Sequence, residues 1–254
     1  MKIRVLGAYG AEGLGQRPSA FLVNERTLVD AGTVTGALTV PEQLDVERVL
    51  VSHSHLDHIG GLAFLTETLA CCGARRPLTI TSIDPVVDAL RNAVFNNVVW
   101  PDFEQIPSSR EPVIRYRKLV AEAEQRLGEL WVTPVPVNHT VPAAGFVVHD
   151  GTRGFVYSGD TGPTEALWKA VRGLTGVRAV ILECAFPNRL QGLAEAARHL
   201  TPQLVEREMD KLPADVPVWI FHIKPQFHQE TAEELSRLDN GRIVLLEQDK
   251  TYEL

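Results

Sequence analysis

Short apolar runs separated by glycine make up the first part of the chain. Their length and their β-branched and aliphatic residues predict strands over 3–6, 20–23, 27–29 and 46–52. Gly10, Gly13 and Gly15 lie between the first two runs, without the strand-to-helix context of a dinucleotide-binding loop. We therefore expect a hairpin loop there.

Apolar residues at helical spacing follow the fourth run. Leu62, Leu65 and Leu69 define one face of a helix after Gly60. The same spacing predicts helices over 84–95, 120–127, 165–172, 202–211 and 231–237. Between them, further strands are predicted over 131–137, 145–149, 154–157, 179–183, 218–222 and 242–246. Four of these strands end near His, Asp or Glu, at the position where α/β proteins place their chemistry.

The composition is that of an ordinary globular protein, with 44% hydrophobic and 22% charged residues. No segment rich in Pro, Gly or Ser separates the two halves of the chain. The sequence therefore predicts one α/β domain over 1–254, with two packed sheets and outer helices.

Charge and cysteine content limit the classes of binding partner and the cellular compartment that we expect. A net charge of -7 gives no general basic field for a nucleic-acid partner. The N-terminus lacks the pattern of a signal peptide, and no run approaches the length of a membrane-spanning helix. Three cysteines fit neither a disulfide framework nor a zinc motif. We expect a soluble cytoplasmic protein without a membrane partner, and leave a homodimer open.

A dense run of metal-ligand side chains lies where a predicted strand leads into a helix. His53, His55, Asp57 and His58 fall within six positions. Neutral imidazole and carboxylate are the ligands that divalent zinc selects. A tight turn can direct the first two residues to one ion and the last two to a second. Histidines of a solvated loop are the less favoured interpretation.

Two metal ions need more ligands than this run supplies. His139, Asp160 and His222 each follow a predicted strand. Taken singly, each is as readily a turn residue or a hydrogen-bonded buried group. Together with the first run they predict a site for two divalent ions, most simply Zn²⁺.

The order of these residues, HxHxDH followed by His, Asp and His, resembles the metallo-β-lactamase superfamily over most of the chain. The resemblance implies a four-layer αβ/βα sandwich and two metal ions that share one carboxylate. It assigns His53, His55 and His139 to one ion, Asp57, His58 and His222 to the other, and Asp160 to both. It also implies that Asp30, in Asp30-Ala31-Gly32, supports the metal loop, although a plain turn residue is the alternative.

A narrower resemblance is to the class II cyclic-nucleotide phosphodiesterases, which hydrolyse cyclic AMP and cyclic GMP. Seven stretches match in order: HSHLDHIGGL from His53, NNVVWPDF from Asn96, HTVPAAGF from His139, GDTGPT from Gly159, ECAFPN from Glu183, HLTP from His199 and HIKP from His222. The resemblance implies hydrolysis of 3′,5′-cyclic nucleotides to 5′-monophosphates by a hydroxide that bridges two metals. One departure is Ala197-Arg198, which stands where the family commonly has Ser-Gly.

Four residues are candidates for roles in the reaction other than metal binding. His199 is expected to donate a proton or to contact phosphate, with Glu183 as its orienting partner, because a carboxylate can keep an imidazole protonated near neutral pH. A helix-capping histidine is the alternative. Asp57 is expected to bind metal and also to accept a hydrogen bond from the bridging hydroxide. Lys224 contacts a phosphate oxygen in one interpretation and solvent in the other.

Aromatic and polar side chains between 96 and 103 form a candidate base pocket for a small cyclic nucleotide. Trp100 and Phe103 can stack on the base, while Asn96, Asn97 and Asp102 contact its edges. Aromatic residues near proline are as often part of the core, so that interpretation stays open.

Other functions remain as alternatives, because a fold alone does not choose between them. A tRNA 3′-endonuclease is disfavoured by the negative charge, and a lactonase or thioesterase by the phosphodiesterase-like stretches. A di-iron oxygen or nitric oxide reductase usually has Glu where this chain has His55, and needs a flavin domain. A non-catalytic metal-containing sensor is disfavoured because all seven ligands are present.

Overall fold

The computed structural model describes residues 1–172, 174–238 and 241–254. The first half of the chain forms β1 (Lys2–Gly7), β2 (Ala20–Val23), β3 (Thr27–Ala31), α1 (Val40–Asp45), β4 (Arg48–Leu50), α2 (Leu56–Cys71), β5 (Leu78–Ile83), α3 (Asp84–Ala89), the π-helical turn η1 (Leu90–Val94) and β6 (Ile114–Leu119). The second half begins with β7 (Gln125–Leu127), β8 (Leu130–Pro136), β9 (Ala144–His149), β10 (Gly154–Tyr157), α4 (Ala166–Val171) and β11 (Val177–Glu183). It continues with the 3₁₀ turn η2 (Asn188–Leu190), α5 (Gln191–Ala197), α6 (Pro202–Met209), β12 (Val218–Phe221), the 3₁₀ turn η3 (Pro225–Phe227), α7 (His228–Leu238), β13 (Ile243–Leu245) and β14 (Thr251–Glu253).

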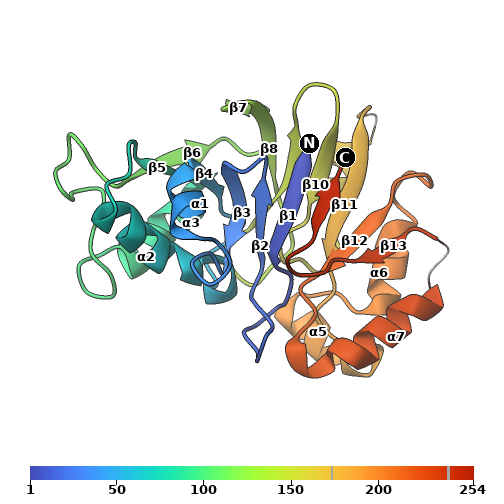
Figure 1. Cartoon of the computed structure of the whole chain (residues 1–254). Coiled ribbons are helices and arrows are strands. Elements are labelled where there is room, and N and C mark those ends of the chain that lie inside the picture. Colours follow the sequence, from blue (N-terminus) through green and yellow to red (C-terminus); the bar gives the residue numbers. More distant parts are fainter. Residues whose placement is uncertain (173, 239–240) are drawn as a thin grey trace.

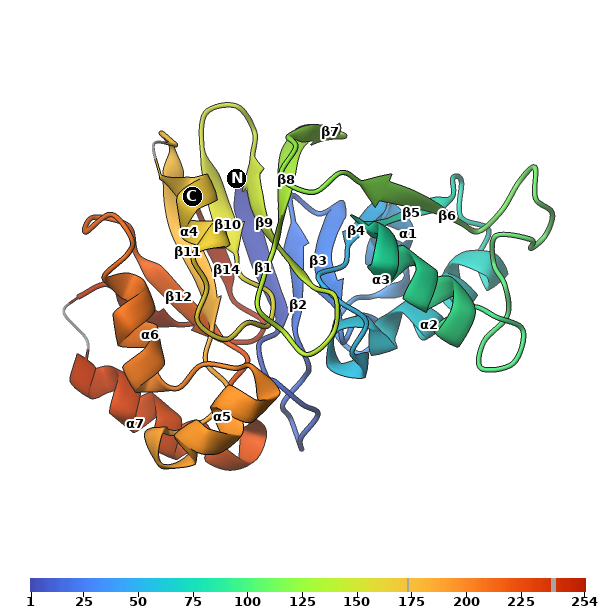
Figure 2. The same ribbon diagram turned by 180° about the vertical axis from the view of Figure 1, so that it is seen from behind.

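The strands form two sheets that pack face to face. Their orders are β14-β1-β2-β3-β4-β5-β6 and β13-β12-β11-β10-β9-β8-β7. Helices α1, α2 and α3 cover the outer side of the first sheet, and α4, α6 and α7 cover the second (Figures 1 and 2). This helix–sheet–sheet–helix arrangement confirms the predicted four-layer sandwich.

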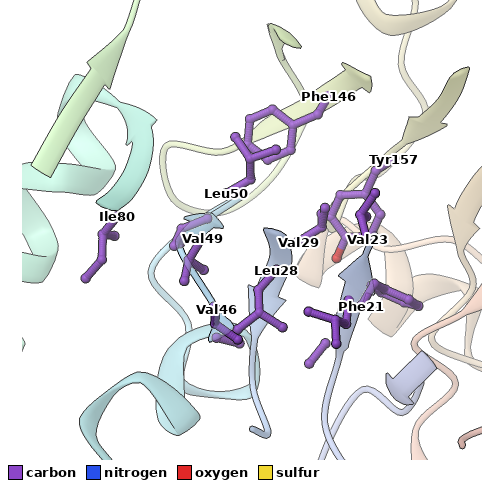
Figure 3. Packing of buried hydrophobic residues seen from close by; sticks show 14 of the residues in the cluster. Phe21, Val23, Leu28, Val29, Val46, Val49, Leu50, Ile80, Phe146 and Tyr157 are labelled. Carbon is purple, nitrogen blue, oxygen red and sulfur yellow. The ribbon is translucent and has the colours of Figure 1, made fainter. Parts of the chain in front are cut away.

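The main core lies between the sheets. Phe21 of the first sheet packs against Tyr157 and Phe221 of the second, with ring centroids 5.6 and 5.5 Å apart, and Figure 3 shows Leu50 and Phe146 in the same cluster. Every residue of β2, β3, β10 and β12 is buried, because these strands are covered on both faces. This explains why they appear in the sequence as continuous apolar runs.

Parallel pairing gathers the carboxyl ends of several strands at one edge of the sandwich. The strands β3 to β6 are parallel to one another, and so are β10 to β13. Asp30 is the penultimate residue of β3, and His53, Asp160, Glu183 and His222 lie at or just beyond the ends of β4, β10, β11 and β12. The fold therefore brings the predicted chemical residues together from distant parts of the sequence.

Most predicted elements are confirmed, including the hairpin between β1 and β2. The helix predicted over 120–127 is wrong, because Glu122 has a left-handed backbone (φ 57°) and β7 pairs with β8. The strand predicted over 46–52 is shorter, spanning only β4. The sequence analysis did not predict α1, β5, β6, α5 or β14. No helix in the described ranges is long and apolar enough to cross a membrane.

Candidate metal centre

The histidine run lies in a tight passage from β4 to α2. His55 is the N-cap of α2, with an extended backbone, and the helix begins at the next residue. Two glycines let the loop after β3 approach this passage. A Cβ on Gly32 would lie 2.0 Å from the carbonyl oxygen of Asp57, and one on Gly61 would lie 2.8 Å from that of Ala31. Only glycine permits such contact between the two segments.

Asp30 braces the passage from inside. Its buried carboxylate accepts hydrogen bonds from Ser52 N and Ser52 Oγ (both 2.7 Å), His58 Nδ1 (2.6 Å) and Tyr157 Oη (2.6 Å). The backbone of Asp30 is left-handed, with φ 54°. Backbone strain of this kind persists where the surrounding contacts fix the residue. Hydrogen bonds thus fix Asp30 to Ser52 and His58 in the passage from β4 to α2, and to Tyr157 in the second sheet. This is the supporting position that its motif implies.

The first predicted ligand group converges on one point. His55 Nδ1 lies 3.1 Å from His53 Nε2 and 3.2 Å from His139 Nε2. Asp160 Oδ2 is 3.6 Å from His53 Nε2 and 4.0 Å from His139 Nε2. The four residues each offer one ligand atom, and these atoms lie within 4.8 Å of one another. That spacing is suited to a single cation.

The second predicted group lies beside the first. Asp57, His58 and His222 also offer ligand atoms within 4.8 Å of one another. Asp160 contacts this group too, because its Oδ1 is 3.1 Å from His58 Nε2 and its Oδ2 is 3.1 Å from His222 Nε2. The carboxylate of Asp160 therefore lies between both groups, in the position expected for a shared ligand.

Four of the five histidines in these groups bond to a fixed partner through their outer nitrogen. The partners are Ser52 Oγ for His53 (3.0 Å), Asp30 Oδ2 for His58 (2.6 Å), Arg198 O for His139 (3.3 Å) and Ser19 Oγ for His222 (3.1 Å). The two serine hydroxyls donate their own hydrogens elsewhere, to Asp30 and to the Tyr9 carbonyl, so they accept from the imidazoles. When the imidazole is neutral, each inner nitrogen presents a lone pair to the site, the arrangement common around metal-binding histidines.

Unpartnered buried atoms show that a cation fits. His58 Nε2, His222 Nε2 and Asp160 Oδ1 are buried and, despite the 3.1 Å distances between the two histidines and Asp160, make no contact of hydrogen-bond geometry with any described residue. Leaving buried polar atoms unpaired is costly, and lone pairs that face one another repel. A divalent ion would satisfy all three, so the donor set suits divalent metal.

Electrostatics prepare most ligands for a cation. Burial lowers the pKa of His53, His55 and His222, and lowers that of His139 to about 4, so these imidazoles are neutral at pH 7. His58 differs: burial lowers its pKa, but the carboxylates of Asp160 and Asp30 outweigh burial and raise it well above the usual value. A proton on His58 and a metal ion therefore compete for the same place.

Glu183 and His199 form a buried pair next to the second group. Glu183 Oε1 accepts a hydrogen bond from His199 Nδ1 at 2.7 Å and one from Thr161 N at 3.0 Å, and Oε2 accepts from Leu200 N at 3.2 Å. The His199 ring stacks on His222, with centroids 5.4 Å apart. Burial lowers the pKa of His199, but the Glu183 carboxylate outweighs it, so the pKa is raised.

Arg198 ties this pair to the first ligand group. It ends α5 in a left-handed conformation, with φ 55°, which glycine adopts more readily. Its guanidinium donates to the carbonyl of His139, and its own carbonyl accepts from His139 Nδ1. Sequence reasoning noted Arg198 only as a departure from the family. It missed Ser19 and Ser52, because isolated serines carry no distinctive pattern.

The structure places the predicted substrate residues in different surroundings. Lys224 does lie at the site, where its Nζ donates to the Gly10 carbonyl and lies 3.4 Å from Asp57 Oδ2. The candidate base pocket differs from its prediction. Phe103 is buried in the core, with 6% of its surface exposed, and this packing position removes it from the pocket.

The polar residues predicted for the base pocket stabilise their own loop. Asn96 Oδ1 accepts from the backbone of residues 98 and 99, Asn97 Oδ1 accepts from Asp102 N, and Asp102 Oδ1 accepts from Glu104 N. These are local turn bonds. Trp100 is partly buried and packs against Phe64, with ring centroids 5.7 Å apart.

Known proteins share this sequence pattern and fold. A probable 3′,5′-cyclic-nucleotide phosphodiesterase from Yersinia pestis is 28% identical over 212 residues, which cover 72% of this chain and 59% of that protein. A ribonuclease Z from Ignicoccus hospitalis is 28% identical over 129 residues, 50% of this chain and 40% of that protein. The chain thus spans about half the length of these relatives. The crystal structure of unliganded yeast PDE1 superposes with a TM-score of 0.82 at 18% identity, covering 98% of each chain.

A match to a sequence model of a protein family assigns this chain to a family. The model described as the beta-lactamase superfamily domain matches residues 25–245, which include every residue of both ligand groups. The superfamily resemblance noted in the HxHxDH run is thereby confirmed. This protein belongs to the beta-lactamase superfamily.

Proposed function

We propose that this protein is a zinc-dependent phosphodiesterase that hydrolyses 3′,5′-cyclic nucleotides to nucleoside 5′-monophosphates. The observation that carries the proposal is the pair of ligand groups that share Asp160, with His199 and Glu183 directly beside them. Two ions about 3.5 to 4 Å apart suit phosphodiester hydrolysis. The phosphodiesterase from Yersinia pestis supports the choice of substrate.

Each residue has a part in the reaction. Two zinc ions, when bound, activate water and neutralise charge on the phosphoryl group. Asp57 orients the attacking water by accepting its hydrogen bond, and Lys224 attracts a phosphate oxygen from the side of Asp57. His199, held by Glu183, faces the second group and donates a proton to the departing 3′ oxygen.

The bonds and protons balance. One water molecule supplies the oxygen that forms the new bond to phosphorus, and the bond from phosphorus to the 3′ oxygen breaks. The 3′ oxygen takes a proton from His199, and the proton lost by water restores the imidazolium. The product keeps its phosphate on the 5′ oxygen.

Product analysis tests the proposal. Zinc-loaded protein is incubated separately with 3′,5′-cyclic AMP and cyclic GMP, and the products are separated by chromatography against 5′- and 3′-monophosphate standards. We expect the 5′-monophosphate alone. Formation of the 3′-monophosphate, or no turnover at full zinc occupancy, would contradict the proposal, and the second result would favour a metal-containing sensor.

Processing of RNA 3′ ends is the second candidate, because a ribonuclease Z also matches half of the chain. That reaction also hydrolyses a phosphodiester and can use the same metal groups. The net charge of -7 disfavours a long RNA substrate. Precursor tRNA in the same assay decides: cleavage at the 3′ end without turnover of cyclic nucleotides would replace the first proposal with this one.

A further inference from the structure

A cavity of about 760 Å³ lies beside the metal-ligand groups, on the side of Asp57. Its walls come from the loop after β1, the loop after β3, the first half of α2, and Lys224. The volume lies within the range of small-ligand sites in proteins. Because Asp57 belongs to both the cavity and the second ligand group, a molecule held at the metals has direct access to this space.

The walls of the cavity differ in character from one part to another. Asp57 and Lys224 supply opposite charges, 3.4 Å apart. An ammonium group carries three donors, and the described partners of Lys224 Nζ are the Gly10 carbonyl and Asp57. Leu56 and Phe64, by contrast, supply apolar surface on α2. The cavity thus suits a ligand with an anionic part and a flat apolar part.

Phe64 lies on the exposed face of α2, whose opposite face packs in the core. Its side chain is 54% exposed, whereas Leu62, Leu65 and Leu69 on the same helix are buried. The Trp100 ring supports Phe64 from one side, at 5.7 Å between centroids and 72° between planes. An exposed aromatic ring held in place by a partly buried neighbour is a suitable surface for stacking.

We propose that this cavity is the nucleoside subsite and that the nucleobase stacks on Phe64. The inference rests on the proposed function, because a cyclic nucleotide joins a phosphate to a flat aromatic base. Trp100 then acts by positioning Phe64 and does not itself contact the base. Every nucleobase offers a π-face, so a stacking subsite accepts adenine and guanine alike.

Calorimetric titration of zinc-loaded protein tests the subsite without requiring turnover. The probes are AMP, GMP and ribose 5-phosphate, which lacks a base. We expect wild type to bind both nucleotides more tightly than the sugar phosphate. In Phe64→Ala, affinity for AMP and GMP should fall at least about fivefold, with affinity for ribose 5-phosphate unchanged. Phe64→Tyr should retain the preference for a base.

Leu193→Ala is the matched control, because Leu193 is 51% exposed on α5 and does not line the cavity. It should change neither affinity. Equal binding of AMP and ribose 5-phosphate by wild type would overturn the subsite, as would equal losses for both probes in Phe64→Ala. If base-dependent binding is lost in Phe64→Ala but wild type does not hydrolyse cyclic nucleotides, the subsite stands and the proposed reaction fails.

Discussion

Replacing Asp30 with Asn tests how far one buried carboxylate supports the metal centre. Asp30 Oδ1 accepts one hydrogen bond, from Ser52 N, and Oδ2 accepts three, from Ser52 Oγ, His58 Nδ1 and Tyr157 Oη. The asparagine oxygen can replace Oδ2, but the amide nitrogen then faces the Ser52 N–H. Asparagine tolerates the left-handed backbone at this position, so the change isolates charge and hydrogen bonding.

The expected cost follows from these four bonds. Hydrogen bonds to a charged group contribute about 1 kcal/mol more than neutral ones, so three weakened bonds cost about 3 kcal/mol, and an unpaired buried donor costs about 1 kcal/mol or more. A typical domain has a free energy of unfolding of about 5 to 15 kcal/mol, so a loss of about 4 kcal/mol is a large part of it. Zinc affinity should fall about 10- to 100-fold, because Asp30 orients His58.

Urea unfolding in the presence of chelator measures the first effect, and competition with a chromophoric chelator measures the second. Tyr157→Phe is the control, because it removes one donor and leaves Asp30 three bonds, for a loss of about 1.5 kcal/mol. If Asp30→Asn destabilises the metal-free protein no more than Tyr157→Phe, the carboxylate does not brace the site and the reasoning is refuted. Unchanged zinc affinity would refute the role toward His58 alone.

Three further predictions concern the centre and its surroundings. Glu183→Gln should move the alkaline limb of the pH–kcat profile for cyclic AMP to lower pH. Glu183 raises the pKa of His199, so without its charge His199 loses its proton at lower pH. An unmoved limb would exclude His199 as the proton donor. Arg198→Gly should be more stable than Arg198→Ala by about 1 kcal/mol in urea unfolding, since both lose the contact with His139 but only glycine relieves φ 55°. Equal stability would show that the backbone there is unstrained. Zinc affinity by chelator competition should weaken from pH 8 to pH 6, because the pKa of His58 is raised and its proton competes with the metal ion; a pH-independent affinity would contradict ligation by His58.

The convergence of the predicted metal ligands could be anticipated from sequence because their positions follow from strand topology. His139, Asp160 and His222 each follow a strand of the second sheet. Strands β10 to β12 are parallel, and β8 runs in the same direction because β9 is antiparallel to both β8 and β10, so all three residues reach one edge of the sheet. Four ligands of the first run are also close in sequence, so their proximity needs no knowledge of the fold. The supporting hydroxyls of Ser19 and Ser52 were not predictable, because each depends on contacts made across the sandwich.

The sequence-based predictions failed where a strand depends on pairing with another strand, or where the burial of a side chain depends on the surrounding loops. The helix predicted over 120–127 covers the residues that follow β6 together with β7. Strand β7 forms because it pairs with β8, which lies outside the segment that suggested a helix. Strands β5 and β6 are held by pairing with β4 and with each other, which no local spacing reveals. Phe103 and Phe64 illustrate the second problem. In the sequence Phe64 lies between Ala63 and Leu65, and Phe103 lies between Asp102 and Glu104, yet Phe64 is 54% exposed and Phe103 only 6%.

The charge of the site connects the metal ions to the choice of substrate. The protein carries a net charge of -7, and Asp30, Asp57 and Asp160 place three carboxylates in or next to the ligand groups. Without metal these groups repel an anion, although the proton on His58 offsets part of their charge. Two divalent ions among neutral imidazoles would reverse the local sign, so under the proposed function the attraction of a phosphate to this site would depend on metal occupancy. Under the proposed function, the metal ions would hold the phosphate and Phe64 the base, so affinity would come from the metal centre and tolerance of different bases from the cavity.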